Sequence, residues 1–272
     1  MTSLINIAKK SFMRRLSIFL FSLFSFFMAK AQLQRDSVGI YCCQPVLHFV
    51  QDCAAPQPGI IWVQIHENEL TVPEVALKVL DSLQKGCIVR WQHVQTRNVQ
   101  FVMNDSLYMF DPNRIFTPEG VVATLESQSR FDSAAAKYVE DLGKQFTGTF
   151  INQQRLVIAM HNNSDGGDLH IGSYASGGIF EADASEVNIN PTLDKDDFFY
   201  VTDRRFFDYL GRKGFNVMLQ NNATVTNDGS LSVYCGMRSI PYLNIEAQLG
   251  HEAEQKRMMI AVMDMISELG FE

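Results

Sequence analysis

Four polar side chains that could support hydrolytic chemistry come directly after short apolar segments of the chain. His66 and Glu69 are three residues apart, so an imidazole nitrogen and a carboxylate oxygen can reach one point. His161 follows a second apolar segment and would complete a set of two histidines and one glutamate. Three protein ligands with a fourth position left open are what a catalytic zinc site requires, and zinc lowers the pKa of a bound water molecule to ~7. Glu246 follows a third apolar segment and adds another carboxylate.

A simpler interpretation of these residues is also open. A histidine and a glutamate three residues apart occur by chance in many chains of this length, and a single histidine at a strand end is usually only hydrogen-bonded. Spacing alone therefore does not decide between a metal site and ordinary buried polar groups.

The segments that must position these side chains alternate between predicted strands and predicted helices. Strands are predicted where short runs of β-branched and aromatic residues are bounded by polar residues, over residues 59–65, 88–91, 98–103, 155–160, 198–201, 217–220 and 242–245. Helices are predicted where apolar residues recur with helical spacing, over residues 72–84, 121–126, 133–146, 203–213 and 252–269. Residues 33–58, which contain three cysteines and three prolines, are predicted to be irregular.

Several predicted strands are apolar on both faces, which predicts an α/β fold with a mixed, largely parallel central sheet flanked by helices. In such sheets, ligands bind at the carboxyl ends of the strands. If the strands are parallel, His66, His161 and Glu246 lie along one edge of the sheet and converge.

The first 31 residues have the pattern of a secretory signal peptide. Basic residues precede an uncharged apolar run over residues 16–29, and Ala29-Lys30-Ala31 offers the small residues that a signal peptidase recognises. The run has fourteen residues, fewer than the ~20 that a spanning helix needs. We therefore predict an exported protein, periplasmic or secreted, with residues 1–31 as signal peptide and residues 32–272 as one catalytic domain. No stable membrane insertion is expected after cleavage; an uncleaved anchor is the alternative.

The charge balance excludes one class of partner. The chain has a net charge of −7, and removal of residues 1–31 takes away five basic and no acidic residues. That leaves 18 Lys and Arg against 30 Asp and Glu, a net charge of −12 over 241 residues. Because so acidic a surface repels the phosphate backbone, no nucleic-acid partner is expected.

All five cysteines follow the predicted signal peptide. Export makes disulfides possible, but the number is odd and the sequence does not give the pairing. A bridge from Cys42 or Cys43 to Cys53 would close the shortest loop. The alternative is that most of the cysteines are small buried apolar residues.

Taken in order, the polar motifs resemble those of the zinc carboxypeptidase superfamily. The chain has His66-Glu-Asn-Glu69, then Asp111-Pro-Asn-Arg-Ile-Phe116, then His161 and finally Glu246. The likeness is greater to the succinylglutamate desuccinylase/aspartoacylase branch, whose members carry these motifs in the same order. The Asp-Pro-Asn-Arg-Ile-Phe segment is the most specific of the four.

The resemblance implies one zinc ion held by His66, Glu69 and His161. It also implies that Glu246 is the catalytic glutamate, which takes a proton from water and passes it to the leaving nitrogen.

The resemblance also implies a set of substrate-binding residues. Asn113 and Arg114 match the pair that binds a substrate carboxylate, which a guanidinium can do through two parallel hydrogen bonds. Arg97 is the first candidate for an arginine that stabilises the oxyanion, and Arg90 is a weaker one. Tyr242 lies close enough before Glu246 to reach substrate, although a buried aromatic residue is equally compatible with the sequence.

These roles predict a zinc-dependent hydrolase that cleaves an amide bond next to a free carboxylate. A metallocarboxypeptidase acting on peptides, including cell-wall peptides, is the first interpretation. An N-acyl amino acid deacylase is the second, because the same residues would serve it. A non-catalytic module that keeps the pocket for binding is the third, and the presence of Glu246 argues against it, since a binding module needs no general base.

Overall fold

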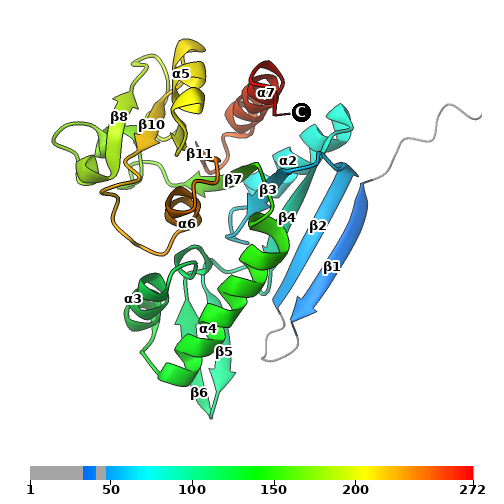
Figure 1. The fold of residues 1–272 in the computed structure, drawn as a ribbon, viewed down its shortest axis with the longest axis vertical. Coiled ribbons are helices and arrows are strands. Elements are labelled where there is room, and N and C mark those ends of the chain that lie inside the picture. Colours follow the sequence, from blue (N-terminus) through cyan, green and yellow to red (C-terminus); the bar gives the residue numbers. More distant parts are fainter. Residues whose placement is uncertain (1–32, 41–46, 272) are drawn as a thin grey trace, which may run out of the picture. The chain divides into compact units, whose positions relative to one another are not determined.

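The computed structural model describes residues 33–40 and 47–271, which belong to one compact unit, Leu33–Glu272 (Figure 1). The predicted signal peptide, Cys42 and Cys43 lie outside the described residues. Among the described residues, no helix is both long enough and apolar enough to span a bilayer.

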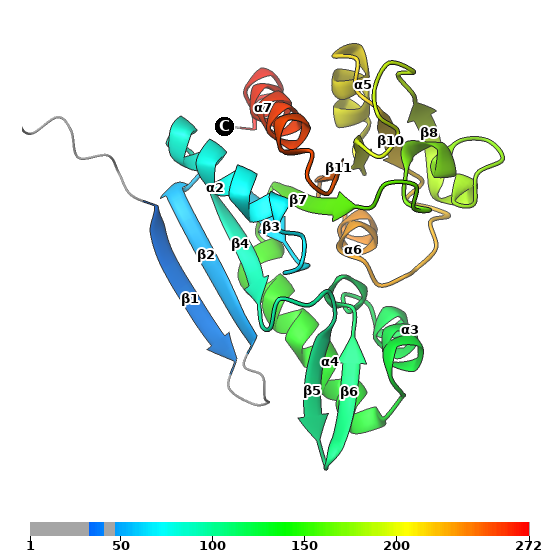
Figure 2. The same cartoon turned by 180° about the vertical axis from the view of Figure 1, so that it is seen from behind.

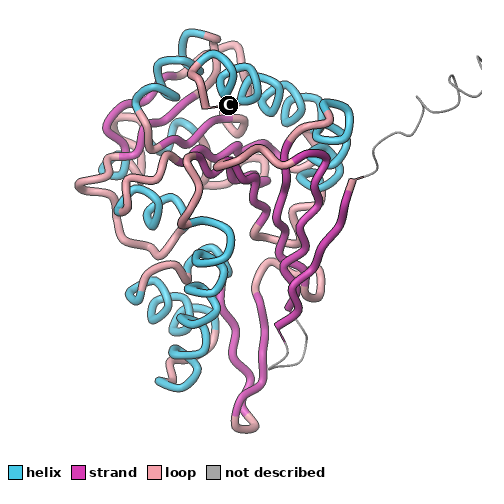
Figure 3. Tube along the Cα trace, turned by 45° about the vertical axis from the view of Figure 1, so that its right-hand side comes forward, coloured by secondary structure: helices cyan, strands magenta, loops and turns pink. Residues whose placement is uncertain are grey.

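A nine-stranded mixed sheet forms the centre of this unit, with the strand order β1-β2-β4-β3-β7-β11-β9-β10-β8. The four central strands β4, β3, β7 and β11 are mutually parallel, and antiparallel pairs lie on both sides of them. The strands are β1 (Gln34–Ile40), β2 (Leu47–Ala55), β3 (Ile60–Gln64), β4 (Gly86–Gln92), β7 (Leu156–Asn163), β8 (Ala184–Asn188), β9 (Phe198–Val201), β10 (Val217–Gln220) and β11 (Tyr242–Gln248). Two further strands, β5 (Val99–Met103) and β6 (Ser106–Phe110), pair only with each other and form a hairpin apart from the central sheet (Figure 3).

Helices cover both faces of the central sheet (Figures 1 and 2). They are α2 (Thr71–Leu83), α3 (Pro118–Gln128), α4 (Ser133–Phe146), α5 (Arg204–Arg212), α6 (Leu231–Met237) and α7 (Glu252–Glu268), with short helical turns η1 (Pro112–Arg114), η2 (Thr147–Ile151), η3 (Ile171–Tyr174) and η4 (Glu181–Asp183). One buried cluster joins α2, α5 and α7 to one face of the sheet, and a second joins α3, α4, α6 and the β5–β6 hairpin to the other. The predicted α/β fold with a mixed, largely parallel central sheet is therefore confirmed.

The apolar character of the central strands follows from this two-sided burial. In β3, Ile60 and Trp62 belong to one cluster, whereas Ile61 and Val63 belong to the other. Because successive side chains of a strand point to opposite faces, a strand covered on both faces is apolar at every position.

The prediction that residues 33–58 are irregular is wrong. β1 and β2 pair along their length, from Gln34 opposite Cys53 to Ile40 opposite Leu47, and β2 pairs in turn with β4. Both strands lie at one side of the sheet in antiparallel pairs, and in β2 a mixture of buried and half-exposed residues replaces a continuous apolar run.

The predicted bridge from Cys42 or Cys43 to Cys53 is also wrong, because Cys53 is bonded to Cys87. The two residues lie opposite each other on the antiparallel strands β2 and β4, so the strand register brings them together. Cys235 is free and buried in the core.

Candidate active site

The first two candidate ligands lie in a tight turn between β3 and α2. The side-chain amide of Gln64, the last residue of β3, donates hydrogen bonds to the backbone carbonyls of His66 (3.0 Å) and Glu69 (3.1 Å). A buried glutamine thus fixes both ends of the turn. His66 and Glu69 are only 1% and 3% exposed.

The other two residues lie within strands rather than after their ends. β7 extends to Asn163 and β11 to Gln248, so His161 and Glu246 are strand residues, and they lie opposite each other in the parallel register. The predicted strand ends were too early because polar side chains interrupt the apolar runs at these positions.

His66, Glu69 and His161 converge on one point. The Nδ1 of His66 lies 2.8 Å from the Oε1 of Glu69, and the Nδ1 of His161 lies 3.0 Å from the Oε2 of the same carboxylate. The two imidazole Nδ1 atoms are 3.2 Å apart. The three ligand atoms all lie within 4.8 Å of one another, and all three residues are buried.

This set of donors fits a zinc ion. Two imidazole nitrogens and a carboxylate oxygen are the ligands of a common type of catalytic zinc site. The Nε2 of His66 lies 2.8 Å from the Oδ1 of Asp111. Donation from Nε2 to this carboxylate leaves the Nδ1 lone pair directed at the ligand cluster, as outer partners of zinc ligands do.

Charge within the buried cluster shifts the pKa values of its members. Burial alone would lower the pKa of His66, but the charge of Glu69 and hydrogen bonds with Asp111 and Glu69 outweigh it and raise the pKa to about 9. Burial alone would raise the pKa of Glu69, but His161 and His66 lower it to about 2. The pKa of Asp111 is likewise well below its usual range because its hydrogen bond with His66 outweighs burial. Both carboxylates are therefore ionised at neutral pH and attract a cation.

Glu246 is buried beside this cluster. Its Oε1 accepts a hydrogen bond of 2.9 Å from the side-chain amide of Asn244, whereas its Oε2 has no hydrogen-bond partner among the described residues. Burial is the main cause of a raised pKa at Glu246, and the charge of Glu69 adds to it, against an opposing effect of His161. A buried carboxylate with a raised pKa and one free oxygen is suited to accept and return a proton.

The eight predicted site residues all line one pocket of about 170 Å³. They are His66, Glu69, Arg97, Asn113, Arg114, His161, Tyr242 and Glu246. The topology thus brings together side chains from β7, β11, the turn after β3 and the loop that holds η1.

Of the two candidate oxyanion arginines, Arg97 lies in the pocket. Its guanidinium nitrogens are 3.3 Å from the carboxylate of Glu69 and 3.3 Å from that of Asp111. Arg90 is buried and forms an ion pair of 2.6 Å with Asp52 on β2. Arg90 therefore has a structural partner, and it does not line the pocket.

The Asp-Pro-Asn-Arg motif forms the short turn η1, which faces the pocket. Asp111 accepts the backbone N–H of Asn113 at 2.8 Å and so caps this turn with the carboxylate that also contacts His66. The side-chain oxygen of Asn113 accepts the backbone N–H of Leu231, at the start of α6. The side chain of Arg114 is 36% exposed, and its Nε lies 3.5 Å from the Oδ2 of Asp228.

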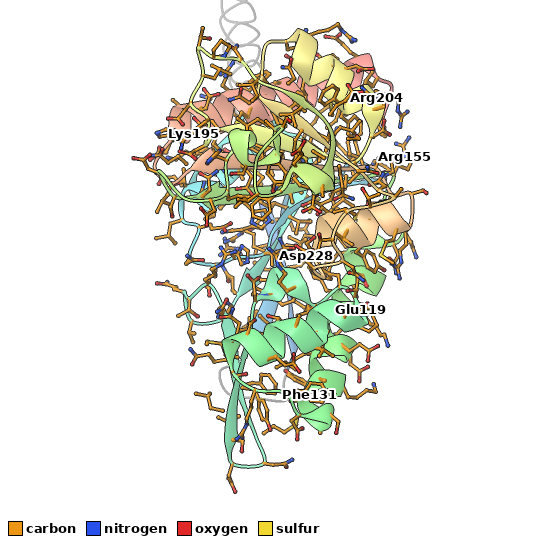
Figure 4. All side chains as sticks on the ribbon, turned by 90° about the vertical axis from the view of Figure 1, so that its left-hand side faces the viewer. Glu119, Phe131, Arg155, Lys195, Arg204 and Asp228 are labelled. Atoms are coloured by element: carbon orange, nitrogen blue, oxygen red, sulfur yellow. A yellow bond between two sulfur atoms is a disulfide. The ribbon has the colours of Figure 1, made fainter. Side chains whose placement is uncertain are left out.

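Other pocket residues were not predicted from the sequence. Tyr174, Asp183 and Asp228 line the pocket from the loops between β7 and β8 and before α6; Asp228 is labelled in Figure 4. These loops have no apolar periodicity that would signal their position. Asp111 was part of a recognised motif, but its contact with His66 depends on the fold. Tyr242, which was predicted, is buried on β11, 2% exposed, and lines the pocket.

Comparison with known proteins gives structural likeness alone. No protein-family model matches the sequence, and no curated protein matches it. The chain resembles a Shewanella frigidimarina protein described as a succinylglutamate desuccinylase/aspartoacylase (TM-score 0.43, 8% identity, 88% of this chain and 72% of the other). It also resembles a metallo-carboxypeptidase from Burkholderia cenocepacia (0.48, 9%, 94% and 69%) and carboxypeptidase A from Helicoverpa armigera (0.43, 9%, 87% and 67%). The function proposed below rests on the geometry of the site itself.

Proposed function

We propose that this protein is a zinc-dependent hydrolase that cleaves an amide bond next to a free carboxylate. The observation that carries the proposal is the placement of Glu246 in the pocket. Glu246 lies on β11, opposite His161 on the adjacent strand β7, and its Oε2 has no hydrogen-bond partner among the described residues. Arg97 and Arg114 line the same pocket. A general base, a cluster of metal ligands and two cationic groups in one pocket are the parts that such a reaction needs.

Each residue then has a defined task. A zinc ion held by His66, Glu69 and His161 would supply a Lewis acid and lower the pKa of water at the site. Glu246 accepts the proton of the attacking water and delivers it to the nitrogen of the leaving group. The raised pKa of Glu246 favours the second half of this task, because the carboxyl group holds the proton long enough to return it.

The arginines bind the charges of the substrate. Arg97, next to Glu69, is placed to stabilise the oxyanion that develops on the attacked carbonyl. Arg114, supported by Asn113, is placed to bind the substrate carboxylate. The Nε of Arg114 lies 3.5 Å from the Oδ2 of Asp228, and one terminal nitrogen donates a hydrogen bond to the backbone carbonyl of Asn113. Both contacts orient the guanidinium.

Peptide C-termini are the proposed substrates, with cell-wall peptides among them, and N-acyl amino acids would use the same residues. Two features support export. Residues 1–31 have the pattern of a signal peptide, and the Cys53–Cys87 disulfide is typical of proteins from oxidising compartments. A non-catalytic binding module is disfavoured, because a buried carboxylate with one unpartnered oxygen, such as that of Glu246, costs stability and serves no purpose in binding an anion.

The test is a comparison of substrates with purified, zinc-loaded protein. N-acyl dipeptides with a free C-terminus, the same peptides as C-terminal amides, and N-acyl amino acids are compared by kcat/KM. Hydrolysis of a free-carboxylate substrate, with a large loss on amidation, is the expected result. Equal hydrolysis of the free and amidated peptides contradicts the proposed carboxylate specificity.

A further inference from the structure

Glu67 lies between two of the proposed zinc ligands, but its carboxylate contacts another part of the chain. Its Oε2 accepts the backbone N–H groups of His93 and Gln95, each at 2.7 Å. The side chain is 16% exposed and does not line the pocket. Glu67 is therefore neither a third carboxylate of the metal cluster nor a residue that touches substrate.

The segment that Glu67 contacts is the loop between β4 and β5. β3 and β4 are parallel neighbours, with Gln64 opposite Arg90, so the loops that follow them leave the sheet at the same edge. In the part of the chain that the structure describes, no backbone–backbone hydrogen bond holds residues 94–97. Gln95 also has a positive φ of 58°. The carboxylate of Glu67 thus binds a backbone segment in which residues 94–97 have no backbone–backbone hydrogen bond among the described residues.

The charge of Glu67 is directed to these amides. The imidazole of His93 is also close, with its Nε2 3.9 Å from the Oε2 of Glu67. Burial lowers the pKa of His93, so this ring is neutral and does not form a strong ion pair. An ionised acceptor makes hydrogen bonds with backbone N–H groups stronger than a neutral acceptor does.

Arg97 lies two residues after Gln95, whose backbone N–H is the second of the two groups bound by Glu67. Its guanidinium lies 3.3 Å from Glu69 and 3.3 Å from Asp111, and about half of its side chain is exposed. A long, half-exposed side chain keeps such a position only if its backbone is fixed. A displacement of about 1 Å at a catalytic group can lower the rate by ~10²-fold.

We propose that Glu67 is a positioning residue for Arg97, which it holds against the ligand cluster through the backbone N–H groups of His93 and Gln95. This inference rests on the proposed function, in which Arg97 stabilises the oxyanion. The short turn after β3 then has two roles. His66 and Glu69 would bind the metal, while Glu67 fixes the loop that carries Arg97.

The experiment compares Glu67→Ala and Glu67→Gln in the zinc-loaded protein, with Glu74→Ala as a control on the exposed face of α2. Amide hydrogen exchange at His93 and Gln95 is measured by NMR, together with kcat, KM and zinc content. Glu67→Ala should speed the exchange of both amides and lower kcat by roughly ten- to a hundredfold, with KM and zinc content unchanged. Glu67→Gln keeps an oxygen acceptor and should retain most of the protection and of kcat, and the control should match the native protein.

A double-mutant cycle with Arg97→Ala tests the route of the effect. In the Arg97→Ala background, Glu67→Ala should cause no further loss of kcat, because residues that act through one another are not additive. Equal losses of kcat in both backgrounds overturn the proposal, as does unchanged amide exchange in Glu67→Ala. If Glu67→Ala does not fold, Glu67→Gln decides: native exchange at both amides with the full loss of kcat also overturns it. The exchange measurement needs no substrate, so it tests the contact of Glu67 with the loop independently of activity. Failure to find any hydrolysis would count against the proposed function alone.

Discussion

Glu246 and His161 lie opposite each other on the adjacent parallel strands β11 and β7. Paired residues of neighbouring strands direct their side chains to the same face, and both side chains line the pocket. The proposed general base is therefore placed beside a proposed zinc ligand by the register of the sheet, which is more rigid than a loop. This relationship makes the roles of the two residues separable by mutation.

Glu246→Gln should leave the fold and the zinc content intact and lower kcat by ~10²–10⁴-fold, the range of general acid–base groups. The amide keeps the shape of the side chain but cannot accept a proton. Metal analysis and steady-state kinetics on the same preparation test this expectation. Loss of zinc together with activity would make Glu246 a ligand instead of a base.

The pKa of His66 predicts how the stability of the metal-free protein depends on pH. Its pKa is raised in the folded state from 6.5 to about 9. Protonation therefore stabilises the fold fully below pH 6.5, and this contribution is lost as the pH rises through about 9. Denaturant titrations of metal-free protein should show the free energy of unfolding fall by about 3 kcal/mol over this window.

The matched control for this pH dependence is His66→Gln, in which the same window should be nearly flat. Zinc-loaded protein should not show the fall, because a ligand imidazole is already deprotonated. Equal slopes for the native and His66→Gln proteins without metal would show that other groups cause the effect.

Asp111→Ala should weaken zinc binding by about ten- to a hundredfold, the usual effect of removing an outer partner of a ligand histidine. Asp111 contacts the Nε2 of His66 at 2.8 Å and also caps the turn that carries Arg114. Asp111→Asn keeps an acceptor oxygen and should lose less. Competition with a chromophoric chelator measures both affinities, and an unchanged zinc affinity in Asp111→Ala would contradict the assigned role of Asp111.

Arg114→Ala should lower kcat/KM for a substrate with a free carboxylate by roughly ten- to a hundredfold, because a charge-assisted contact of this kind contributes roughly 1.5–3 kcal/mol. Arg114→Lys should restore only part of the activity, since lysine keeps the charge without the planar fork. Amidation of the substrate should harm the native enzyme greatly and the Arg114→Ala variant little. If both lose equally on amidation, Arg114 is a structural partner of Asp228 and does not bind the carboxylate.

The central strands could be predicted from the sequence because burial on both faces leaves a continuous apolar run. β1 and β2 could not, since β2 is only partly buried and its pairing with β4 joins segments far apart along the chain. The same reason explains the missed disulfide, because Cys53 and Cys87 are brought together by strand register. Short elements with weak patterns, such as β6, β8 and α6, were also not predicted.

Eight of the residues that line the candidate pocket could be selected from the sequence, whereas their surroundings could not. Motif order was enough to select His66, Glu69, His161 and Glu246, although the last two were expected after strand ends. His161 and Glu246 are polar residues inside strands because they line the pocket. Their polarity interrupts the apolar runs, so the strands were predicted to end too early. The contact of Asp111 with a ligand and the support of the loop before Arg97 join segments far apart in the sequence, so only the fold reveals them.

The central claim is that His66, Glu69 and His161 hold one zinc ion, and metal analysis of purified protein tests it most directly. Native protein, dialysed against zinc and then against buffer, should contain one zinc per chain. His161→Ala should contain much less under the same conditions, whereas His48→Ala, on β2 and outside the pocket, should match the native protein. Native protein that holds no zinc after this treatment, or a His161→Ala variant that holds as much as the native protein, would contradict the assignment.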